Sequence, residues 1–482
     1  MALNLNPFRS LPNPREVWAW GMYDFANQSF TLLIITLLFS LFVKQAVTPW
    51  PPMTEAQAER IALIESGEAS LDPIDEPDIA TLIDERQAAD RAGSWNWSLM
   101  HGTGLLLVVL ASPVVGALAD SRGLRKQLLI GTGVLCCALT CSLAGIGPGM
   151  LTLAALLYIP ANICYQLGEN MLASFLPQIA ERRNLGRISA IGWTMGYAGA
   201  LALLIIVFIA IKLTGRDEPP QWRPFFIFAG LWFAIGMLPS VFLLRDDPPD
   251  RTISRNLVAE SLGRVRDTLR HASRYQDLVL FLTAFFVYAL GVQTVIAFAS
   301  ILAERFGIVG NQLVVFVLQI TLTAGIASIA TARFQDRIGA RATVLIYLAV
   351  WIVSCAGLLA MTFVPAVPTA FFWIVGNGLG FALGGIGTSS RSMVARFTPR
   401  HRTAEFFGLW GMAYKLAGAI GVLSFGAVTR LLGHEASSIL LTSFFVAGFI
   451  LVLPVRELRG YRAARRAERD HARRPAADTI HA

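Results

Sequence analysis

The sequence predicts an all-α membrane protein in which twelve transmembrane helices form two pseudo-symmetric six-helix bundles. Three observations favour this fold class: a very apolar composition, a series of long apolar runs, and a short charged motif that occurs once in each half of the chain. Of the 482 residues, 55% are hydrophobic and 15% are charged, and the mean hydropathy is +0.56. Soluble globular proteins are less apolar and carry about 25% charged residues, so this composition excludes a soluble fold.

The first apolar run extends from Val17 to Val47, after a polar leader at residues 1–16. It is too long for the core of a signal peptide and no small-residue cleavage site follows it, so we expect a retained first helix. The next segment, Thr48–Gly93, is the longest hydrophilic loop and holds eleven acidic residues against three basic ones. We expect this acidic loop to lie outside the membrane.

Eleven further apolar runs follow, and each is long enough to cross about 30 Å of hydrocarbon at about 1.5 Å per residue. They lie at Ser94–Ala119, Arg125–Ile146, Met150–Ile179, Arg187–Leu213, Arg223–Leu244, Asp277–Ala303, Asn311–Ala332, Ala342–Val364, Pro368–Arg396, Ala404–Leu432 and Ala436–Val455. The first six spans are expected to form an N-terminal bundle at residues 17–245, and the last six a C-terminal bundle at residues 277–455.

Arginine-rich segments all fall on one side of the predicted membrane. They include the connector Asp246–Gln276 between the bundles and the basic tail at residues 456–482. The positive-inside rule places this side and both termini in the cytoplasm, so in a bacterium the protein would occupy the inner (plasma) membrane. The connector fits a helix lying on an anionic leaflet or a solvated linker helix. The net charge of +8 reflects these segments and gives no support for nucleic-acid binding.

A charged turn joins the second and third apolar runs, in the segment Gly116–Lys126, and its Asp-x-x-Gly-x-Arg skeleton returns at the corresponding place in the second half. Glycine permits a tight turn, while the Asp and Arg can cap or pair the helix ends beside them. The residues assigned to these gating or signature loops are Gly116, Asp120, Gly123, Arg125, Asp336, Gly339 and Arg341. The turn resembles the signature loop of the major facilitator superfamily, and the resemblance covers the whole chain. It implies the major facilitator fold.

The duplication continues inside the spans. The pattern Trp-x-Met-x-Tyr begins at Trp193 in the fifth span and again at Trp410 in the eleventh. Transporter folds are built from such internal repeats, with the substrate site near the middle of the bilayer where the repeats meet.

Four charged residues lie well inside predicted spans: Asp24, Glu169, Arg391 and Lys415. Each would cost about 2.5–3.5 kcal/mol at the bilayer centre if it faced lipid. They are therefore expected to face water, one another or a ligand. Arg391 lies close enough to the end of its span that it could instead extend to the membrane surface, or act as a gate without touching substrate.

Polar side chains accompany these charges on single helix faces. In the fourth span they recur at helical spacing from Asn162 to Asn170, a pattern that lines a cavity more often than it joins helices. The stripe in the first span could also be a hydrogen-bonded cluster between helices. The residues expected to bind substrate or couple transport are Asp24, Asn27, Gln28, Asn162, Gln166, Glu169, Asn170, Asn377, Arg391, Tyr414 and Lys415.

A narrower resemblance rests on several segments spread over both halves. These are Trp18–Phe30, Phe175–Ala180, Gly186–Ser189, Ser390–Ser392 and Ala404–Gly408 followed by Lys415. They resemble the vacuole-effluxer branch, which comprises autophagy-related amino-acid effluxers of fungal vacuoles and bacterial relatives. Two departures from known patterns matter. Gly387 stands where relatives often carry Gln, and the Gly-Pro pair of drug/proton antiporters is missing from the fifth span.

The resemblance implies secondary transport rather than enzymatic activity, and no H-E-x-x-H, G-x-S-x-G or P-loop motif occurs. We expect a monomeric, proton-coupled transporter of a small polar solute, with an amino acid or organic anion favoured. A non-transporting sensor or scaffold, and an exporter of a drug or lipid, remain alternatives. The five cysteines lie inside apolar runs without metal-ligand spacing, so no metal or other cofactor is expected.

Overall fold

The computed structural model describes residues 11, 13–65, 69–179, 185–245, 263, 270, 275–363, 369–399 and 402–472. All regular structure within these ranges is helical. The expected surface helix in the connector at residues 246–276 lies almost wholly outside the described residues, as does the end of the basic tail.

Twelve of the helical segments are long and apolar enough to cross a membrane, so the predicted number of spans is confirmed. In the first half the spans are α1 (Pro14–Ser29) continued by η1 (Phe30–Leu37), α2 (Phe39–Phe42) and η2 (Val43–Val47), then α4 (Pro77–Arg122), α5 (Arg125–Ser142), α6 (Leu151–Ser174), α8 (Leu185–Thr214), and α9 (Arg223–Gly236) with α10 (Leu238–Leu243). In the second half they are α12 (Gln276–Glu304), α13 (Gly310–Ile338), α14 (Ala340–Met361), α15 (Thr369–Phe397), α16 (Thr403–Leu432) and α17 (His434–Val452). Short helices α3 (Glu55–Glu65) and α7 (Leu176–Ile179) and a terminal helix α18 (Glu457–Ala472) complete the fold.

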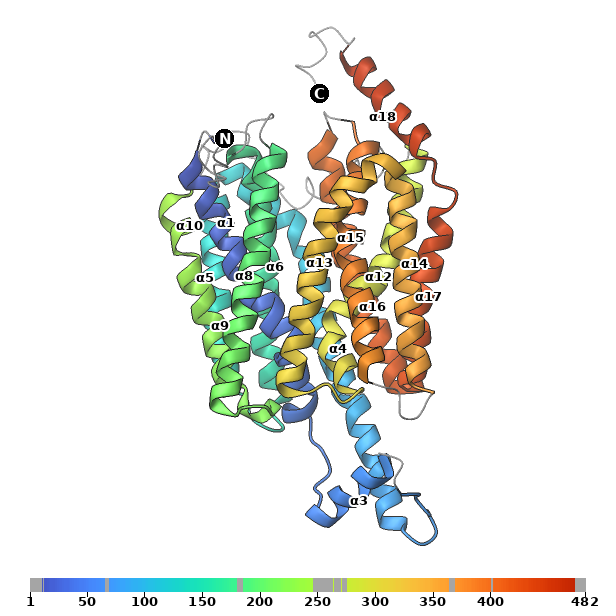
Figure 1. Ribbon diagram of the computed structural model, residues 1–482. Helices are drawn as coiled ribbons and strands as arrows, with labels where there is room; N and C mark the ends of the chain where they lie inside the picture. Colours follow the sequence, from blue (N-terminus) through green and yellow to red (C-terminus); the bar gives the residue numbers. More distant parts are fainter. Residues whose placement is uncertain are drawn as a thin grey trace, which may run out of the picture.

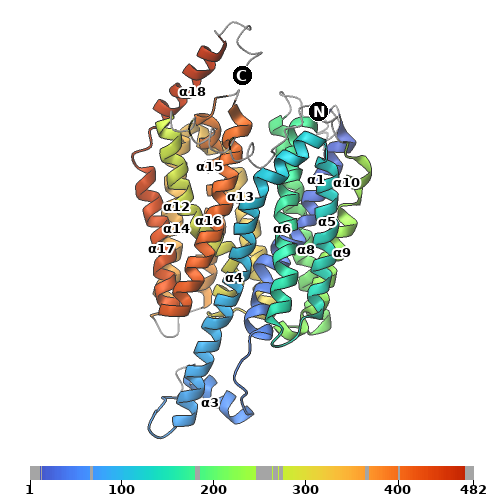
Figure 2. The same ribbon diagram turned by 180° about the vertical axis from the view of Figure 1, so that it is seen from behind.

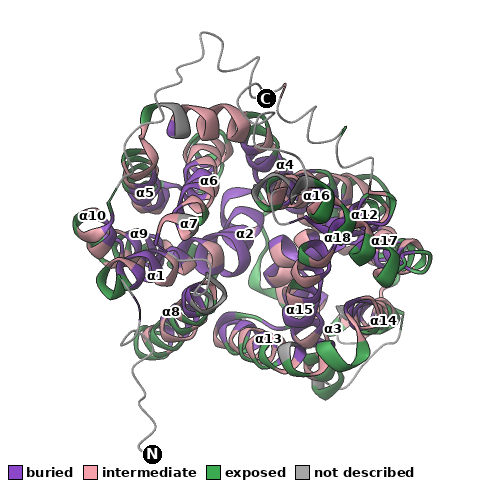
Figure 3. Ribbon diagram, turned by 90° about the horizontal axis from the view of Figure 1, so that it is seen from above, coloured by how far each residue is buried: buried purple, intermediate pink, exposed green. Residues whose placement is uncertain are grey.

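The helices form two bundles, seen side by side along the membrane normal in Figure 3. The bundles meet through two equivalent pairs of helices. Helix α4 packs along α16, and α8 packs along α13. Because α4 and α8 are the second and fifth spans, and α13 and α16 the eighth and eleventh, the contacts between the halves follow the internal repeat.

The first span is not a uniform α-helix. It changes to π-helical hydrogen bonding at Phe30–Leu37 and again at Val43–Val47. The wider π turn shifts the side chains that follow it around the helix axis and is found most often at functional sites. Beyond the first π segment, the Ser40 hydroxyl lies 2.8 Å from that of Ser300 on α12, so this end of the span contacts the other half.

The acidic loop is largely helical, which the hydropathy pattern did not predict. It contains α3, and α4 begins at Pro77 rather than at the expected Ser94. Pro77 occupies the first turn of α4 and Asp78 supplies negative charge there, and both favour a helix start. At about 1.5 Å per residue, the part of α4 before Ser94 adds about 25 Å. Figures 1 and 2 show this extension and α3 projecting from the end of the bundles opposite α18.

Both signature loops make the tight turn expected from their glycines. Gly123 ends α4 with φ +62°, and Gly339 separates α13 from α14 with φ +90°. These left-handed conformations are rare for other residues. In the second loop, Asp336 accepts a 3.1 Å hydrogen bond from Arg396 on α15. The side chain of Asp120 in the first loop lies outside the described part of the chain.

Candidate substrate and coupling site

The four intramembrane charges come from four different helices, two in each half. Asp24 lies on α1 and Glu169 on α6, whereas Arg391 lies on α15 and Lys415 on α16. Each half therefore contributes charges of one sign to the region between the bundles.

Lys415 crosses to the first half. Its Nζ donates to the Asn170 side-chain oxygen at 2.7 Å and to the Gln166 backbone oxygen at 3.0 Å, both on α6. It is also close enough to Glu169 for their charges to interact. Asn170 in turn donates to the Ser112 hydroxyl on α4 at 3.0 Å. The lysine predicted to be functional thus bridges the halves.

Glu169 is connected to the first span. Its carboxylate accepts a hydrogen bond from the amide of Asn27, which is fully buried. The Gln28 amide donates to the Asn27 side-chain oxygen at 3.3 Å. The stripes predicted on spans one and four therefore meet through hydrogen bonds between the helices, and cavity lining stays a prediction.

Asp24 and Arg391 are the second pair of opposite charges across the halves, and they lie close enough for their charges to interact. The Arg391 guanidinium also lies over the ring of Trp410, 5.8 Å from its centroid. Asp24 packs against α8 at Gly196, where a methyl group in place of hydrogen would lie 2.9 Å from the carboxylate oxygen. A glycine is therefore needed there for Asp24 to keep this position.

Asn162 is fully buried, and neither polar atom of its side chain has a hydrogen-bond partner among the described residues. It lies two helical turns before Glu169 on the same face of α6 and packs against Gly104 of α4. Buried amides are nearly always satisfied, so an unpartnered one marks a place where a water molecule or ligand would be stabilised.

Two other predicted residues are not part of this cluster: Asn377 lies apart from it, and Tyr414 lies beside it. Asn377 is exposed and binds within its own half, accepting from Thr323 at 2.9 Å and donating to the Trp373 backbone oxygen at 3.1 Å. It is about 21 Å from Arg391 along α15 by helical rise. Tyr414 precedes Lys415 and stacks on Trp410 with ring centroids 6.3 Å apart, so it borders the cluster through its aromatic face.

The sequence reasoning missed a second polar cluster between the halves, which we call the outer cluster: Lys44, Gln45, Asp90, Glu304 and His434. Lys44 is fully buried and pairs with Asp90 and with Glu304, the latter at 2.6 Å. Asp90 also lies 2.6 Å from His434, and Gln45 donates to Glu304 at 2.7 Å. The feature of the sequence that could have revealed the outer cluster was a lysine inside the apolar run Val17–Val47.

A third polar group lies at the opposite end and belongs to the second half alone. Glu457 on α18 accepts from Arg396 at 2.5 Å and from the Arg341 backbone at 3.0 Å. Asp277 at the start of α12 accepts two bonds from Arg459, at 2.6 and 2.9 Å. The second signature loop is thus tied to the terminal helix.

Within the described ranges, no three His, Cys, Asp or Glu side chains are grouped as a metal ion would require. All five cysteines are free thiols.

The sequence model of a family described as "Vacuole effluxer Atg22 like" matches residues 12–465. The chain belongs to this family. It is similar to an uncharacterized MFS-type transporter, YxiO, from Bacillus subtilis, with 24% identity over 91% of this chain and 94% of the relative. It is also similar to autophagy-related protein 22 from Kluyveromyces lactis, with 22% identity over 86% of this chain and 88% of that protein.

Solved structures give the same fold. The crystal structure of a D-xylose-proton symporter superposes with a TM-score of 0.64 at 12% identity, covering 92% of this chain and 98% of the other. The family member described here is therefore a multi-pass membrane protein with the major facilitator fold, and it is a transporter rather than an enzyme.

Proposed function

We propose that the protein is a secondary active transporter that moves a zwitterionic amino acid or a small organic anion by alternating access, coupled to protons. The observation that carries the proposal is that Lys415 of the second half binds α6 of the first beside Glu169, and that Asp24 and Arg391 lie near enough for their charges to interact across the halves. Charges buried in a membrane protein are expensive unless they pair or serve a ligand.

The charge layout favours a substrate that carries a carboxylate. Arg391 offers a planar guanidinium that can bind a carboxylate with two hydrogen bonds, and Lys415 adds a point charge. Asp24 and Glu169 could receive an amino group or the coupling proton. A lipophilic cation offers no group to Arg391 or Lys415 and would have to compete with them for Asp24 and Glu169, so a multidrug role fits less well.

Coupling follows from the contacts of Glu169. While it is ionised, Glu169 attracts Lys415 and accepts from Asn27. A proton on this carboxylate would weaken both contacts and loosen the bridge between the halves. We therefore assign proton uptake to Glu169 or Asp24. In the next step of the transport cycle, Lys415 and α6 would move apart.

We infer that the end of the molecule that carries the acidic loop is closed in the state described here. Contacts between the halves gather toward the acidic loop, where Ser40 meets Ser300, Trp97 donates to the Ala297 backbone oxygen at 2.8 Å and Lys44 binds Glu304. We place the termini in the cytoplasm, so this is the inward-facing state of a monomeric transporter. The opposite state requires these outer contacts to separate.

Counterflow in proteoliposomes tests the proposal. Vesicles containing the purified protein are loaded with one unlabelled amino acid or organic acid at a time, and uptake of the labelled compound is measured. Arg391→Lys keeps the positive charge but loses the planar guanidinium that can donate two hydrogen bonds to one carboxylate. Substrate affinity should therefore fall roughly ten- to a hundredfold, as expected when one charge-assisted hydrogen bond is lost. Arg216→Lys, at an exposed loop arginine, is the matched control.

Three outcomes would change the proposal. If no compound shows counterflow, the protein is a sensor or scaffold instead. If Arg391→Lys and Lys415→Gln bind substrate as the wild type does but turn over slowly, the two cations form a gate and do not bind the substrate. If transport is indifferent to a pH gradient, proton coupling is wrong.

A further inference from the structure

A pocket lies far from the intramembrane charges, at the end of the second half that carries α18. Helix α17 ends at Val452, the chain turns, and α18 begins at Glu457. The turn and the first part of α18 enclose a hollow of about 960 Å³ against the end of α13 and the start of α14. The position places it at the surface of the bilayer, on the face of the membrane where both α1 begins and α18 lies (Figure 1).

Helix α18 is docked rather than free. Arg459 binds Asp277 with two hydrogen bonds, and Glu457 binds Arg396. Gly460 packs so closely on Phe397 that an added methyl would lie 2.5 Å from the ring, and Ala464 is buried one turn later. The walls of the pocket are therefore held by contacts on the far side of α18.

The lining of the pocket is strongly basic. Its charged residues are Arg341, Arg456, Arg459, Arg462, Arg466 and a single acid, Glu457. That acid is already engaged by Arg396 and by the Arg341 backbone, and Arg459 is engaged by Asp277. In the part of the chain that the structure describes, Arg456, Arg462 and Arg466 make no salt bridge. Arg456 lies close enough to Asp277 for their charges to interact, so Arg462 and Arg466 are the two exposed cations that border the hollow without a salt-bridge partner among the described residues.

Arg341 adds a second observation. One end of its guanidinium donates to the Leu453 backbone oxygen at 2.5 Å, whereas its Nε is buried and has no partner among the described residues. A buried donor without an acceptor costs free energy. Because Arg341 lines the pocket, an anionic oxygen there would lie beside the same guanidinium.

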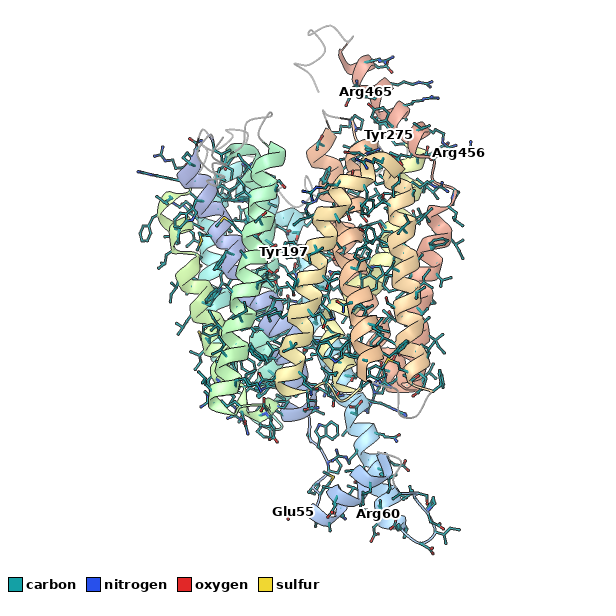
Figure 4. All side chains as sticks on the ribbon, in the orientation of Figure 1. Glu55, Arg60, Tyr197, Tyr275, Arg456 and Arg465 are labelled. Atoms are coloured by element: carbon teal, nitrogen blue, oxygen red, sulfur yellow. The ribbon has the colours of Figure 1, made fainter. Side chains whose placement is uncertain are left out.

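The rim of the same pocket is apolar. Ile338, Leu453 and Leu458 line it and are 45%, 46% and 70% exposed. In Figure 4, Arg456 lies near the end of α17 and Arg465 farther along α18, so the basic residues begin where the membrane-spanning part ends. A ligand that suits the whole site has an anionic head and apolar chains.

We propose that this pocket binds the head group of an anionic phospholipid, with the phosphate between Arg341 and the arginines of α18 and the acyl chains along Ile338 and Leu458. Arginine is well suited to phosphate because it presents several donors in one plane. A free phosphate would use the same arginines but would leave the apolar rim exposed. The site would anchor α18, and with it the second signature loop, to the lipid surface.

Native mass spectrometry of the full-length protein tests this site. Detergent-solubilised protein is mixed with either phosphatidylglycerol or phosphatidylcholine of the same acyl chains. The detergent is removed in the mass spectrometer, and the lipid molecules that stay bound are counted. Arg462→Gln with Arg466→Gln removes two pocket charges. Arg465→Gln with Arg469→Gln removes two charges from the same helix outside the pocket and serves as the matched control.

We expect the wild type and the control pair to retain phosphatidylglycerol in preference to phosphatidylcholine. The pocket pair should bind it roughly thirtyfold more weakly, from the usual contribution of two basic residues near an anionic surface. An equal loss of phosphatidylglycerol binding in both double variants would mean that the positive charge of α18 attracts the lipid without a defined pocket, and would overturn the site. Displacement of the lipid by millimolar inorganic phosphate would overturn the lipid in favour of a free anion.

Discussion

The outer cluster and the intramembrane charges both join the two halves, yet they are built differently. In the outer cluster Lys44 is fully buried and has two carboxylate partners, one of which also binds His434. In the intramembrane cluster Lys415 binds neutral oxygens of Asn170 and Gln166, while Arg391 lies over an aromatic ring. The first arrangement satisfies its own charges and closes a contact. In the second, Lys415 is held by neutral oxygens, and in our proposal a substrate carboxylate exchanges with these contacts.

The largest effect is expected at Glu169, because we propose that the intramembrane charges take part in transport, whereas the outer cluster only holds the two halves together. Glu169→Gln removes the charge that interacts with Lys415 together with one of the two carboxylates proposed to take up the proton. Uptake driven by a pH gradient should fall by about a hundredfold or more, consistent with the roughly 3–5 kcal/mol cost of leaving one buried charge unpaired. Uptake is measured in proteoliposomes with Glu59→Gln, an exposed acid on α3, as the control. Retained pH-driven uptake would place coupling elsewhere.

Lys44→Met is expected to open the outer end. The substitution removes the buried cation that contacts both Asp90 and Glu304, so the closed contact should be destabilised by about 3–5 kcal/mol. A cysteine at Ser300, introduced after the native cysteines are replaced, should then react with a polar maleimide added from the acidic-loop side at least tenfold faster. Lys212→Met, at an exposed lysine, should leave the reaction unchanged. Equal labelling in both variants would mean that Lys44 does not hold the closure.

Gly196→Ala is a smaller perturbation that tests how tightly Asp24 is placed. The added methyl would lie 2.9 Å from the Asp24 carboxylate, so the carboxylate must move. We expect a loss of stability of about 1–3 kcal/mol, as for other overpacked positions, and a clear loss of transport. Gly131→Ala on α5, where a methyl meets nothing within 4 Å, is the control and should be neutral or slightly stabilising. Thermal unfolding and counterflow are read on the same samples.

The smallest effect is expected at Arg60, whose guanidinium binds Glu76 at 2.9 Å and joins α3 to the start of α4. This pair is open to water, and exposed ion pairs contribute little because solvent and salt screen them. Arg60→Gln should leave both melting temperature and transport unchanged within error. A measurable loss would show that the projecting helices take part in the transport cycle.

The number and order of the spans could be predicted because an apolar run long enough to cross a bilayer is a local property of sequence. The acidic loop shows the limit of that reasoning. Hydropathy carries no information about helices in water, so α3 and the start of α4 at Pro77 were overlooked. Pro77 and Asp78 in the first turn were the local signs of the helix start.

Which residues belong to the site could be predicted from the sequence better than which of them lie next to one another. Burial forbids unpaired charge, which pointed to Asp24, Glu169, Arg391 and Lys415 from sequence. Which acid faces which base depends on how α6 and α16 meet across the halves, and no spacing in the sequence encodes that contact. Lys44 was missed because a lysine near the end of an apolar run ordinarily extends its amine to the surface; here α4 and α12 cover it.

Helix α4 runs without a break from Pro77 outside the bundles to Arg122 at the first signature loop, and it packs along α16 of the other half. Between Pro77 and Pro113 the helix has no internal proline, so this part transmits a change of its tilt within the bundles to its projecting end. For an extension of about 25 Å, a tilt of about 10° moves the tip by about 4 Å. The projecting end of α4 is therefore an external indicator of the transport state. A binding protein that held this end in one orientation would arrest the cycle without entering the membrane.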